Sequence, residues 1–253
     1  MRKLFFEVKQ FFVFSFRLLY VFISGGRKCA VCGRLVFTKP ICTACMKHYF
    51  RTESILEKER CECCGKELIS MKGRCMICRE NPVLVSTDGV IPLFSYRLWN
   101  RELMFRWKSQ EEREFSPIFA RLLYEGLRKT GDRVLVPVPP RKGKIRKKGW
   151  DQIEELCSII HHRYKRPILR LLKRVSSQQQ KKLDRKGRLL LGSSSYKENA
   201  KNLKKVAKSG SLPVEALLLD DVMTTGATVE ACAGVLKGMG IRKVQVITLF
   251  IVD

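Results

Sequence analysis

Two adjacent carboxylates, Asp220 and Asp221, end an apolar run in the stretch LLLDDVMTTGATVEAC, residues 217–232. The loop TTGAT that follows offers backbone N–H groups, threonine hydroxyls and the positive end of a helix dipole, which together can bind a phosphate. Since carboxylates repel phosphate, the two aspartates should face another part of the ligand. Ionised aspartates accept hydrogen bonds, so the vicinal hydroxyls of a sugar fit them. The pattern therefore predicts a site for a ribose 5-phosphate.

Other interpretations of this stretch exist. A Walker loop would need Gly-Lys-Ser/Thr, and a dinucleotide-binding fold would need G-x-G-x-x-G at its first turn; this stretch has neither. A carboxylate pair that binds only a metal ion is one alternative. A helix cap beside an incidental pair of acids is the other.

Nine of the eleven cysteines lie between Cys29 and Cys78 and form a repeat. CAVCGRLVFTKPICTAC is echoed by CECCGKELISMKGRCMIC, and in each unit a glycine follows the first of two C-x-x-C pairs. Such a pair can place two thiolates about 2.3 Å from one tetrahedral ion. The spacing predicts two structural zinc sites, one formed by Cys29, Cys32, Cys42 and Cys45 and the other by Cys61, Cys64, Cys75 and Cys78, with Cys63 left over.

The pairing within this repeat has an alternative, in which the first pair joins the third and the second joins the fourth. Disulfides or a redox motif explain the repeat less well, because no secretory signal is evident and a redox motif does not come as four pairs. Four thiolates leave no open position on the metal, so we expect the zinc to be structural. A module of this size also needs the metal to fold.

Strands and helices alternate in the region that must position the acid pair. Ser116 and Pro117 are typical of a helix start, and the apolar run 214–219 is typical of a strand buried on both faces. The alternation predicts an α/β fold, a parallel sheet flanked by helices, in which ligands bind beyond the carboxyl ends of the strands. The expected strands are 85–96, 134–139, 214–219 and 244–252, and the expected helices are 116–129, 151–163 and 228–237.

The formal net charge of +26 and the isoelectric point near 9.9 indicate polyanionic partners: nucleic acid, phosphorylated small molecules or an anionic membrane face. A basic surface without such a partner is the alternative. A hydrophobic content of 45% is typical of a globular protein. An acid-free basic run, residues 141–148, follows the strand that ends at prolines.

The N-terminal stretch is apolar but shorter than a membrane span, and Arg17 interrupts it. We expect an amphipathic helix over residues 1–25 that packs on the protein, with peripheral membrane contact as the alternative. No convincing cleavage site follows it. The predicted division is therefore this helix, a double four-cysteine module over 26–82, and an α/β domain over 83–253.

The stretch LLLDDVMTTGAT resembles the phosphoribosyl-pyrophosphate (PRPP) signature of type I phosphoribosyltransferases. Cysteine pairs ahead of such a domain are the arrangement of the ComF competence proteins, and the resemblance extends over nearly the whole chain. It implies a type I phosphoribosyltransferase-like fold in which Asp220 and Asp221 bind the ribose hydroxyls. It further implies a 5-phosphate site at Thr224, Thr225, Gly226, Ala227 and Thr228, and a pyrophosphate and hood region at Pro137, Val138, Pro139, Pro140, Arg141, Lys148 and Gln152.

The implied reaction is displacement of pyrophosphate from the anomeric carbon of PRPP, with Mg²⁺ neutralising the leaving group. The sequence identifies no general base for it. The chain departs from the family at Lys148 and Asp151, where the family has Arg and Asn, and at Leu191, where an Asn is common. Thr224 stands where purine-salvage enzymes carry an acid, which disfavours purine acceptors.

A second hypothesis is a non-catalytic competence factor that binds single-stranded DNA and retains a PRPP-sensing or vestigial site. A basic groove with Trp99, Trp107 and Trp150 as stacking platforms would serve that role. The resemblance implies a part in DNA uptake alongside other competence proteins. We expect a cytoplasmic location, with the inner face of the membrane as the alternative.

Overall fold

The computed structural model describes residues 15, 19, 21–23, 25–51, 59–69, 73–80, 82–131, 133–141, 143–145, 149–175 and 195–252. Its contacts divide the chain into two compact units. The first combines Met1–Arg51 with Arg101–Phe115, and the second combines Thr52–Asn100 with Ser116–Asp253. The boundaries 1–25, 26–82 and 83–253 stay a prediction.

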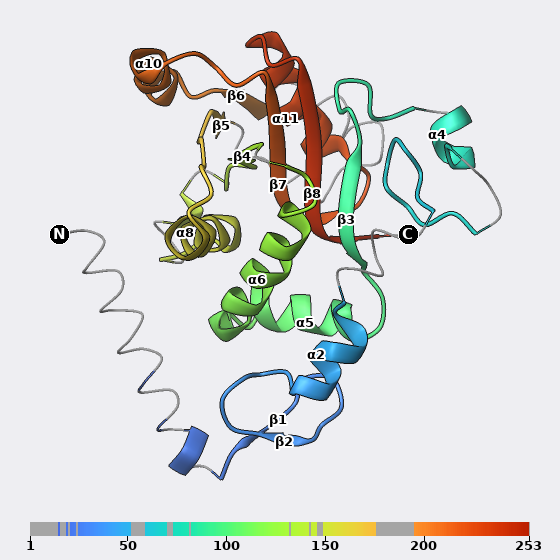
Figure 1. The fold of residues 1–253 in the computed structure, drawn as a ribbon, viewed down its shortest axis with the longest axis vertical. Coiled ribbons are helices and arrows are strands. Elements are labelled where there is room, and N and C mark those ends of the chain that lie inside the picture. Colours follow the sequence, from blue (N-terminus) through green and yellow to red (C-terminus); the bar gives the residue numbers. More distant parts are fainter. Residues whose placement is uncertain are drawn as a thin grey trace. The chain divides into compact units, whose positions relative to one another are not determined.

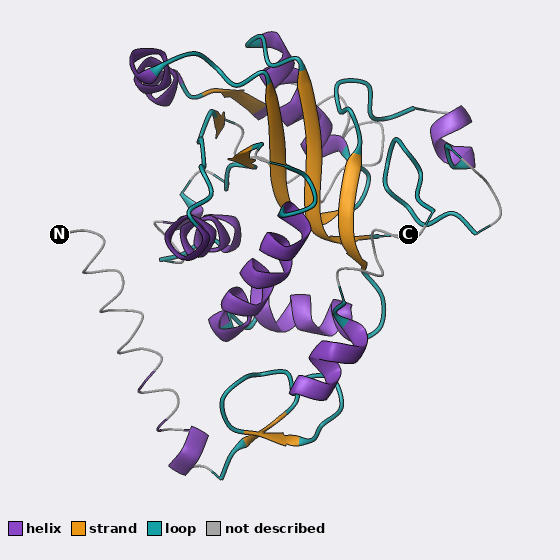
Figure 2. Cartoon of the chain, viewed as in Figure 1, coloured by secondary structure: helices purple, strands orange, loops and turns teal. Residues whose placement is uncertain are grey.

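The second unit is built on a four-stranded sheet in the order β3-β8-β7-β4, in which every neighbouring pair is parallel (Figures 1 and 2). The strands are β3 (Val90–Ser95), β4 (Val134–Pro137), β7 (Glu215–Met223) and β8 (Lys243–Ile251). The two central strands are apolar and buried over most of their length, as expected for strands covered on both faces. The predicted α/β class, with its parallel sheet and N-terminal cysteine-rich region, is confirmed.

Helices cover both faces of this sheet. Helix α11 (Ala227–Gly238) shares a core with Ala216, Leu218, Val244 and Val246 on one face. On the other face lies α6 (Ser116–Leu127), whose Gly126 comes so close to Leu93 that a Cβ there would be 2.7 Å from Cδ2 of the leucine. Helix α8 (Gln152–Tyr164) packs along α6, where the rings of Tyr124 and Tyr164 stack with centroids 4.0 Å apart.

Further elements of the second unit follow α8 or precede β3. Strands β5 (Leu172–Arg174) and β6 (Tyr196–Glu198) pair antiparallel, and helix α10 (Ala200–Ser209) begins at its N-cap Asn199. Helix α4 (Met76–Glu80) carries the last cysteine of the second four-cysteine cluster. The expected elements of the sequence did not include β5, β6 or α10.

The described part of the first unit includes a short hairpin and several helical segments. Strands β1 (Arg27–Lys28) and β2 (Leu35–Val36) pair antiparallel, and α2 (Thr43–Tyr49) follows them. Helix α5 (Trp99–Lys108) and the 3-10 helix η1 (Arg113–Phe115) add the buried side chains of Trp107 and Phe115. Arg27 and Glu114 form an ion pair that ties the hairpin to η1.

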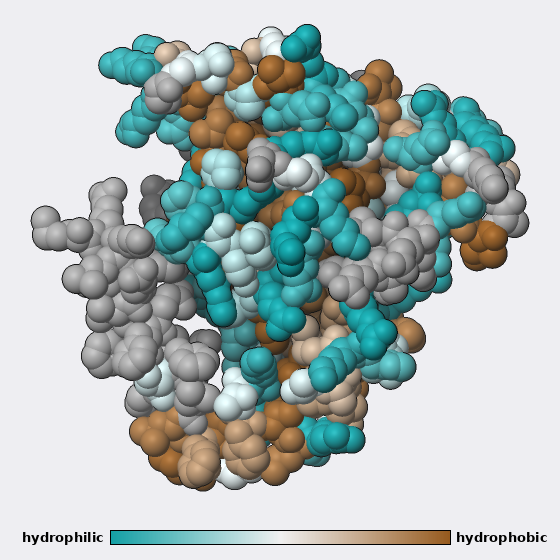
Figure 3. Space-filling view, in the orientation of Figure 1, coloured by the Kyte–Doolittle hydropathy of each residue, from teal (hydrophilic) through white to brown (hydrophobic). Residues whose placement is uncertain are grey.

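Most of the predicted N-terminal helix lies outside the described residues. Ser15, Leu19 and Val21–Ile23 are described and helical, and the side chains of Leu19 and Ile23 are exposed. Apolar side chains gather at the β1–β2 end of the first unit in Figure 3, where the rings of Phe22 and Phe37 lie 6.1 Å apart. Among the described residues, no helix combines the length and the apolar character that a membrane span requires.

Candidate functional site

The acid pair lies within the last part of β7 rather than after it. The sequence predicted a strand that ends at Leu219, whereas β7 continues through both aspartates to Met223. The reason is its neighbour β8, which pairs Thr248 with Asp220 and Ile251 with Met223. The backbone of both aspartates is therefore held in extended geometry at the carboxyl end of the sheet.

Strand β4 ends before β7 does, so β4 does not pair with the last residues of β7. The last β4 pair is Pro137 with Leu219, and the N–H of Val138 donates to the carbonyl of Leu219 at 3.0 Å. The turn 138–141 therefore leaves the sheet where Asp220 begins. Two segments of the predicted site, Pro137–Arg141 and Asp220–Asp221, meet at this edge although many residues separate them in sequence.

The two aspartates direct their side chains to opposite faces of the sheet, because strand residues alternate. Asp220 lies on the α11 face, where its negative charge acts on buried groups. Burial raises the pKa of Tyr196 to about 12 and the pKa of Cys232 well above its usual value, and the charge of Asp220 adds to both shifts. Oδ1 of Asp220 accepts a hydrogen bond of 2.8 Å from the N–H of Asp221. Asp221 itself is only 7% exposed.

The turn after β7, where the sequence predicts a phosphate site, leads directly into a helix. Gly226 has φ +80°, which a residue with a Cβ resists, and α11 begins directly after it at Ala227. Thr224 is exposed, Thr225 and Thr228 are half-buried, and Oγ1 of Thr225 accepts from the N–H of Ala227 at 3.4 Å. The first turn of a helix presents N–H groups and a partial positive charge, so this turn can receive an anion.

The predicted hood residues are only partly described. Lys148 lies outside the described residues, as does Leu191, where the chain departs from the family. Gln152 is buried at the start of α8, and its side-chain oxygen accepts from Nζ of Lys144. The same ammonium group contacts Oδ2 of Asp151 at 2.6 Å, while Oδ1 of Asp151 caps the helix by accepting from the N–H groups of Ile153 and Glu154.

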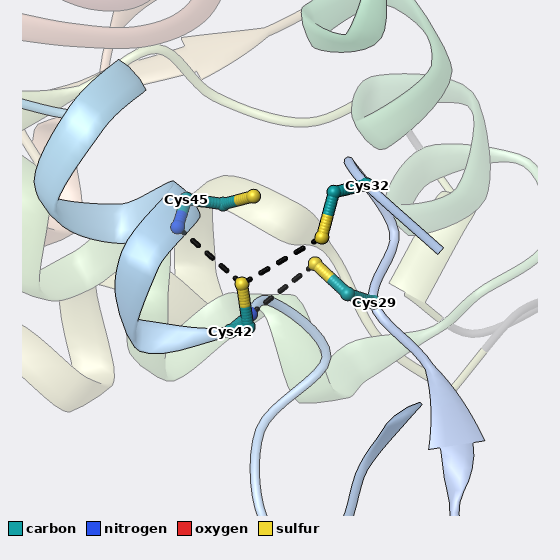
Figure 4. A group of neighbouring side chains, drawn as sticks. All are labelled: Cys29, Cys32, Cys42 and Cys45. Carbon is teal, nitrogen blue, oxygen red and sulfur yellow. Dashed lines mark hydrogen bonds between the residues drawn. The ribbon is translucent and has the colours of Figure 1, made fainter. Parts of the chain in front are cut away.

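The eight predicted zinc ligands form two clusters of four, and the pairs join consecutively rather than interleaved. In each cluster the four sulfur atoms lie within 4.8 Å of one another. In the first, the Sγ atoms of Cys32 and Cys42 are 3.8 Å apart, and the N–H of Cys42 donates to Sγ of Cys29 (Figure 4). In the second, the Sγ atoms of Cys64 and Cys75 are 3.7 Å apart, and the N–H of Cys75 donates to Sγ of Cys61.

These separations fit a zinc ion. Four sulfurs at about 2.3 Å from a tetrahedral centre are about 3.8 Å from one another. The first cysteine of each cluster is also prepared to ionise. Burial raises the pKa of Cys29, but the hydrogen bonds from the backbone of Cys32, Cys42 and Val31 outweigh it and lower the pKa to about 6. The same opposition in the second cluster lowers the pKa of Cys61 to about 7.

A hollow of about 450 Å³ lies beside the first cluster. Three of its lining residues are cations, Arg34, Lys47 and Arg51, and the rings of His48 and Tyr49 meet edge to face with centroids 4.5 Å apart. Cys32, Cys42, Ala44 and Cys45 complete the lining. The lining contains no acid, so the hollow suits an anion that also presents an aromatic group.

Two of the three tryptophans are not available as stacking platforms. Trp107 is 0% exposed and Trp150 is 7% exposed, so neither presents a ring face to a base. The prediction that they stack on DNA is wrong for these two residues, because both pack into the hydrophobic core. Sequence alone could not distinguish a buried tryptophan from an exposed one, whereas His48 and Tyr49 follow Cys45 closely and could have been found from that spacing.

No family model matches the chain. A search of curated proteins finds Competence protein ComFC of Streptococcus pneumoniae (strain ATCC BAA-255 / R6), which is 25% identical over 238 residues. The aligned region covers 88% of this chain and 99% of that protein. This similarity over most of both chains, together with the two four-cysteine clusters, confirms the resemblance to the ComF proteins.

Proposed function

We propose that this relative of a ComFC protein acts in natural competence and binds PRPP at the carboxyl end of β7. One observation carries the proposal. The acid pair, the turn 138–141 and the turn 224–228 come together at one edge of a parallel sheet, where ligands of such folds bind. Carboxylates, helix N–H groups and a basic segment then offer partners for a diol, a phosphate and a pyrophosphate.

The residues have separate tasks in this proposal. Asp220 and Asp221 leave the carboxyl end of β7 on its two faces and accept hydrogen bonds from ribose hydroxyls that lie beyond that end. The turn 224–228 holds the 5-phosphate at the start of α11. Residues 137–141 face the pyrophosphate, and Arg141 is a cation in the described part of that turn. Mg²⁺ bound mainly by PRPP oxygens would neutralise charge on the leaving pyrophosphate.

Transfer would break the bond between the anomeric carbon and pyrophosphate and form a bond from the same carbon to the acceptor. The protein would contribute mainly positioning and electrostatic stabilisation. Thr224 in place of an acid leaves no carboxylate at the start of the phosphate turn to move a proton on a purine. We therefore expect an acceptor that needs no base at that position.

PRPP binding is tested by calorimetry with Mg²⁺ and PRPP. Asp221→Asn should weaken binding at least about tenfold, because a charge-assisted hydrogen bond contributes about 1.5–3 kcal/mol. Glu215→Gln, at the opposite end of the same strand, is the control and should bind like wild type. Loss of binding in both variants, or in neither, contradicts the proposal. Pyrophosphate release across a panel of bases and amines then identifies the acceptor.

Single-stranded DNA binding by the first cysteine module is a second candidate function, favoured by the hollow beside its cluster. Residues 26–51 contain six cations and no acid: Arg27, Lys28, Arg34, Lys39, Lys47 and Arg51. The three that line the hollow can contact phosphates, and Tyr49, which is exposed, offers a ring for stacking. The same combination of cations and rings is typical of sites that bind single strands.

Fluorescence anisotropy with an oligonucleotide tests this second function. Replacing Arg34, Lys47 and Arg51 together by Gln should lower the slope of log affinity against log salt by about 2, because each phosphate contact contributes about 0.7. Asp221→Asn should leave DNA affinity and slope unchanged. A triple variant with the wild-type slope would place the DNA surface elsewhere.

A further inference from the structure

A short segment connects the second cysteine cluster to the phosphate turn. This strap, residues 84–87, runs from the cluster toward the first turn of α11. At its start, Sγ of Cys63 donates to the carbonyl of Leu84 at 3.8 Å. Cys63 is the cysteine left without a metal role, and it lies between ligands Cys61 and Cys64. The cluster is thus joined to the strap through the same turn that holds two of its thiolates.

The side chain of Leu84 rests directly on the phosphate turn. A Cβ at Gly226 would lie 2.8 Å from Cδ2 of Leu84, closer than real Cβ contacts come. Leu84 is 7% exposed and belongs to the same apolar core as Cys61, Cys64, Cys78 and Met223. Position 226 therefore needs glycine both for its positive φ and for this close contact. Because Leu84 packs on the turn, a displaced Leu84 would remove a contact that holds the turn in its conformation.

Hydrogen bonds fix the far end of the strap to α11. The carboxylate of Glu230, in the first turn of that helix, accepts from the N–H of Ser86 at 2.5 Å and from the N–H of Thr87 at 3.2 Å. Oγ1 of Thr87 donates to the same carboxylate at 2.9 Å. Charge-assisted bonds of this kind are about twice as strong as neutral ones. Both carboxylate oxygens of Glu230 therefore accept hydrogen bonds from the strap.

We propose that metal binding in the second cysteine cluster positions the phosphate turn through the strap. The inference rests on the proposed PRPP site and assigns Leu84 and Glu230 as positioning residues for it. Without the metal, the four sulfur atoms are no longer bonded to one tetrahedral centre, and the turn 61–65 loses its geometry. Leu84 then loses its fixed position over Gly226, and the turn 224–228 is no longer held for the phosphate.

The first cluster provides a matched control, because it has the same ligand geometry and belongs to the other compact unit. Cys75→Ser and Cys42→Ser should each lower the zinc content from two ions to one. Calorimetry with Mg²⁺ and PRPP should show a dissociation constant at least tenfold higher for Cys75→Ser and unchanged within twofold for Cys42→Ser. Amide exchange across residues 224–228 should accelerate only in Cys75→Ser.

A variant that keeps every thiol guards against misfolding of Cys75→Ser. Leu84→Ala should raise the PRPP dissociation constant three- to tenfold, accelerate exchange at 224–228 and leave the zinc content at two. Wild-type protein that fails to bind PRPP would overturn the proposed function itself. Wild-type protein that binds PRPP, with equal affinity and equal exchange in Leu84→Ala and in a folded Cys75→Ser, would overturn only the link between cluster and turn.

Discussion

The two cysteine clusters share one local geometry and differ in almost everything around it. In the first, the N–H of Cys29 donates to the carbonyl of Arg34 at 2.7 Å; in the second, the N–H of Cys61 donates to the carbonyl of Lys66 at 2.8 Å. The glycines after the first pairs have φ +73° and +74°. A repeated sequence therefore repeats its turn, its hydrogen bonds and its sulfur spacing.

Charge and burial separate the two modules. The first carries only cations over residues 26–51, whereas residues 59–80 of the second carry five cations and four acids. Cysteines of the second cluster belong to the apolar core that β7 and α11 share. One motif thus supports an exposed basic surface in one unit and part of a hydrophobic core in the other, which predicts different consequences for the same substitution.

The largest expected difference follows the loss of one ligand. Cys61→Ser should lower the free energy of unfolding of the sheet unit by at least about 3 kcal/mol, since structural zinc contributes about 10 kcal/mol to small metal modules. That corresponds to roughly 10 °C in the unfolding midpoint. Cys29→Ser should leave the sheet unit unchanged. The urea dependence of amide exchange in β7 and β8 measures both, and equal effects would show that the modules are not distinct.

Alanine at Gly33 and at Gly65, the glycines that follow the first cysteine pair of each module, should give a smaller but still clear difference in stability. Both substitutions force a Cβ into a left-handed conformation, which destabilises by about 1–2 kcal/mol. At Gly33 nothing lies within 4 Å of the new atom, whereas at Gly65 it would lie 2.5 Å from the carbonyl oxygen of Val90. Gly65→Ala should therefore destabilise its unit by about 2 kcal/mol more than Gly33→Ala does. Urea unfolding measures the difference, and matched values would argue against the tight packing of the second module.

The smallest expected effect concerns DNA and the cations that follow those glycines. Arg34→Gln should weaken binding of single-stranded DNA about fivefold at 0.1 M salt, the contribution of one phosphate contact. Lys66→Gln, at the equivalent position of the second module, should change the affinity by less than twofold. Anisotropy titrations at several salt concentrations check this. A larger effect at Lys66 than at Arg34 would place the DNA surface on the second module and contradict the prediction.

Much of the fold could be predicted because its signals are local. The apolar run before Asp220 indicated β7, and Gly226 indicated the turn before α11. The end of β7 could not be predicted in the same way, since Val222 and Met223 are extended only because Phe250 and Ile251 of β8 pair with them. Trp107 and Trp150 show the same limit, because an aromatic residue in sequence does not indicate whether it is buried.

The sequence by itself determined the two four-cysteine clusters, the acid pair and the glycine turn before α11, because spacing and side-chain chemistry are properties of a short stretch of chain. Only the tertiary structure decided which surroundings each stretch receives. It brought residues 137–141 to Asp220, placed Leu84 over Gly226, and built the second cysteine cluster into the apolar core that β7 and α11 share. These outcomes depend on packing between segments far apart in the chain, and no local pattern encodes such contacts.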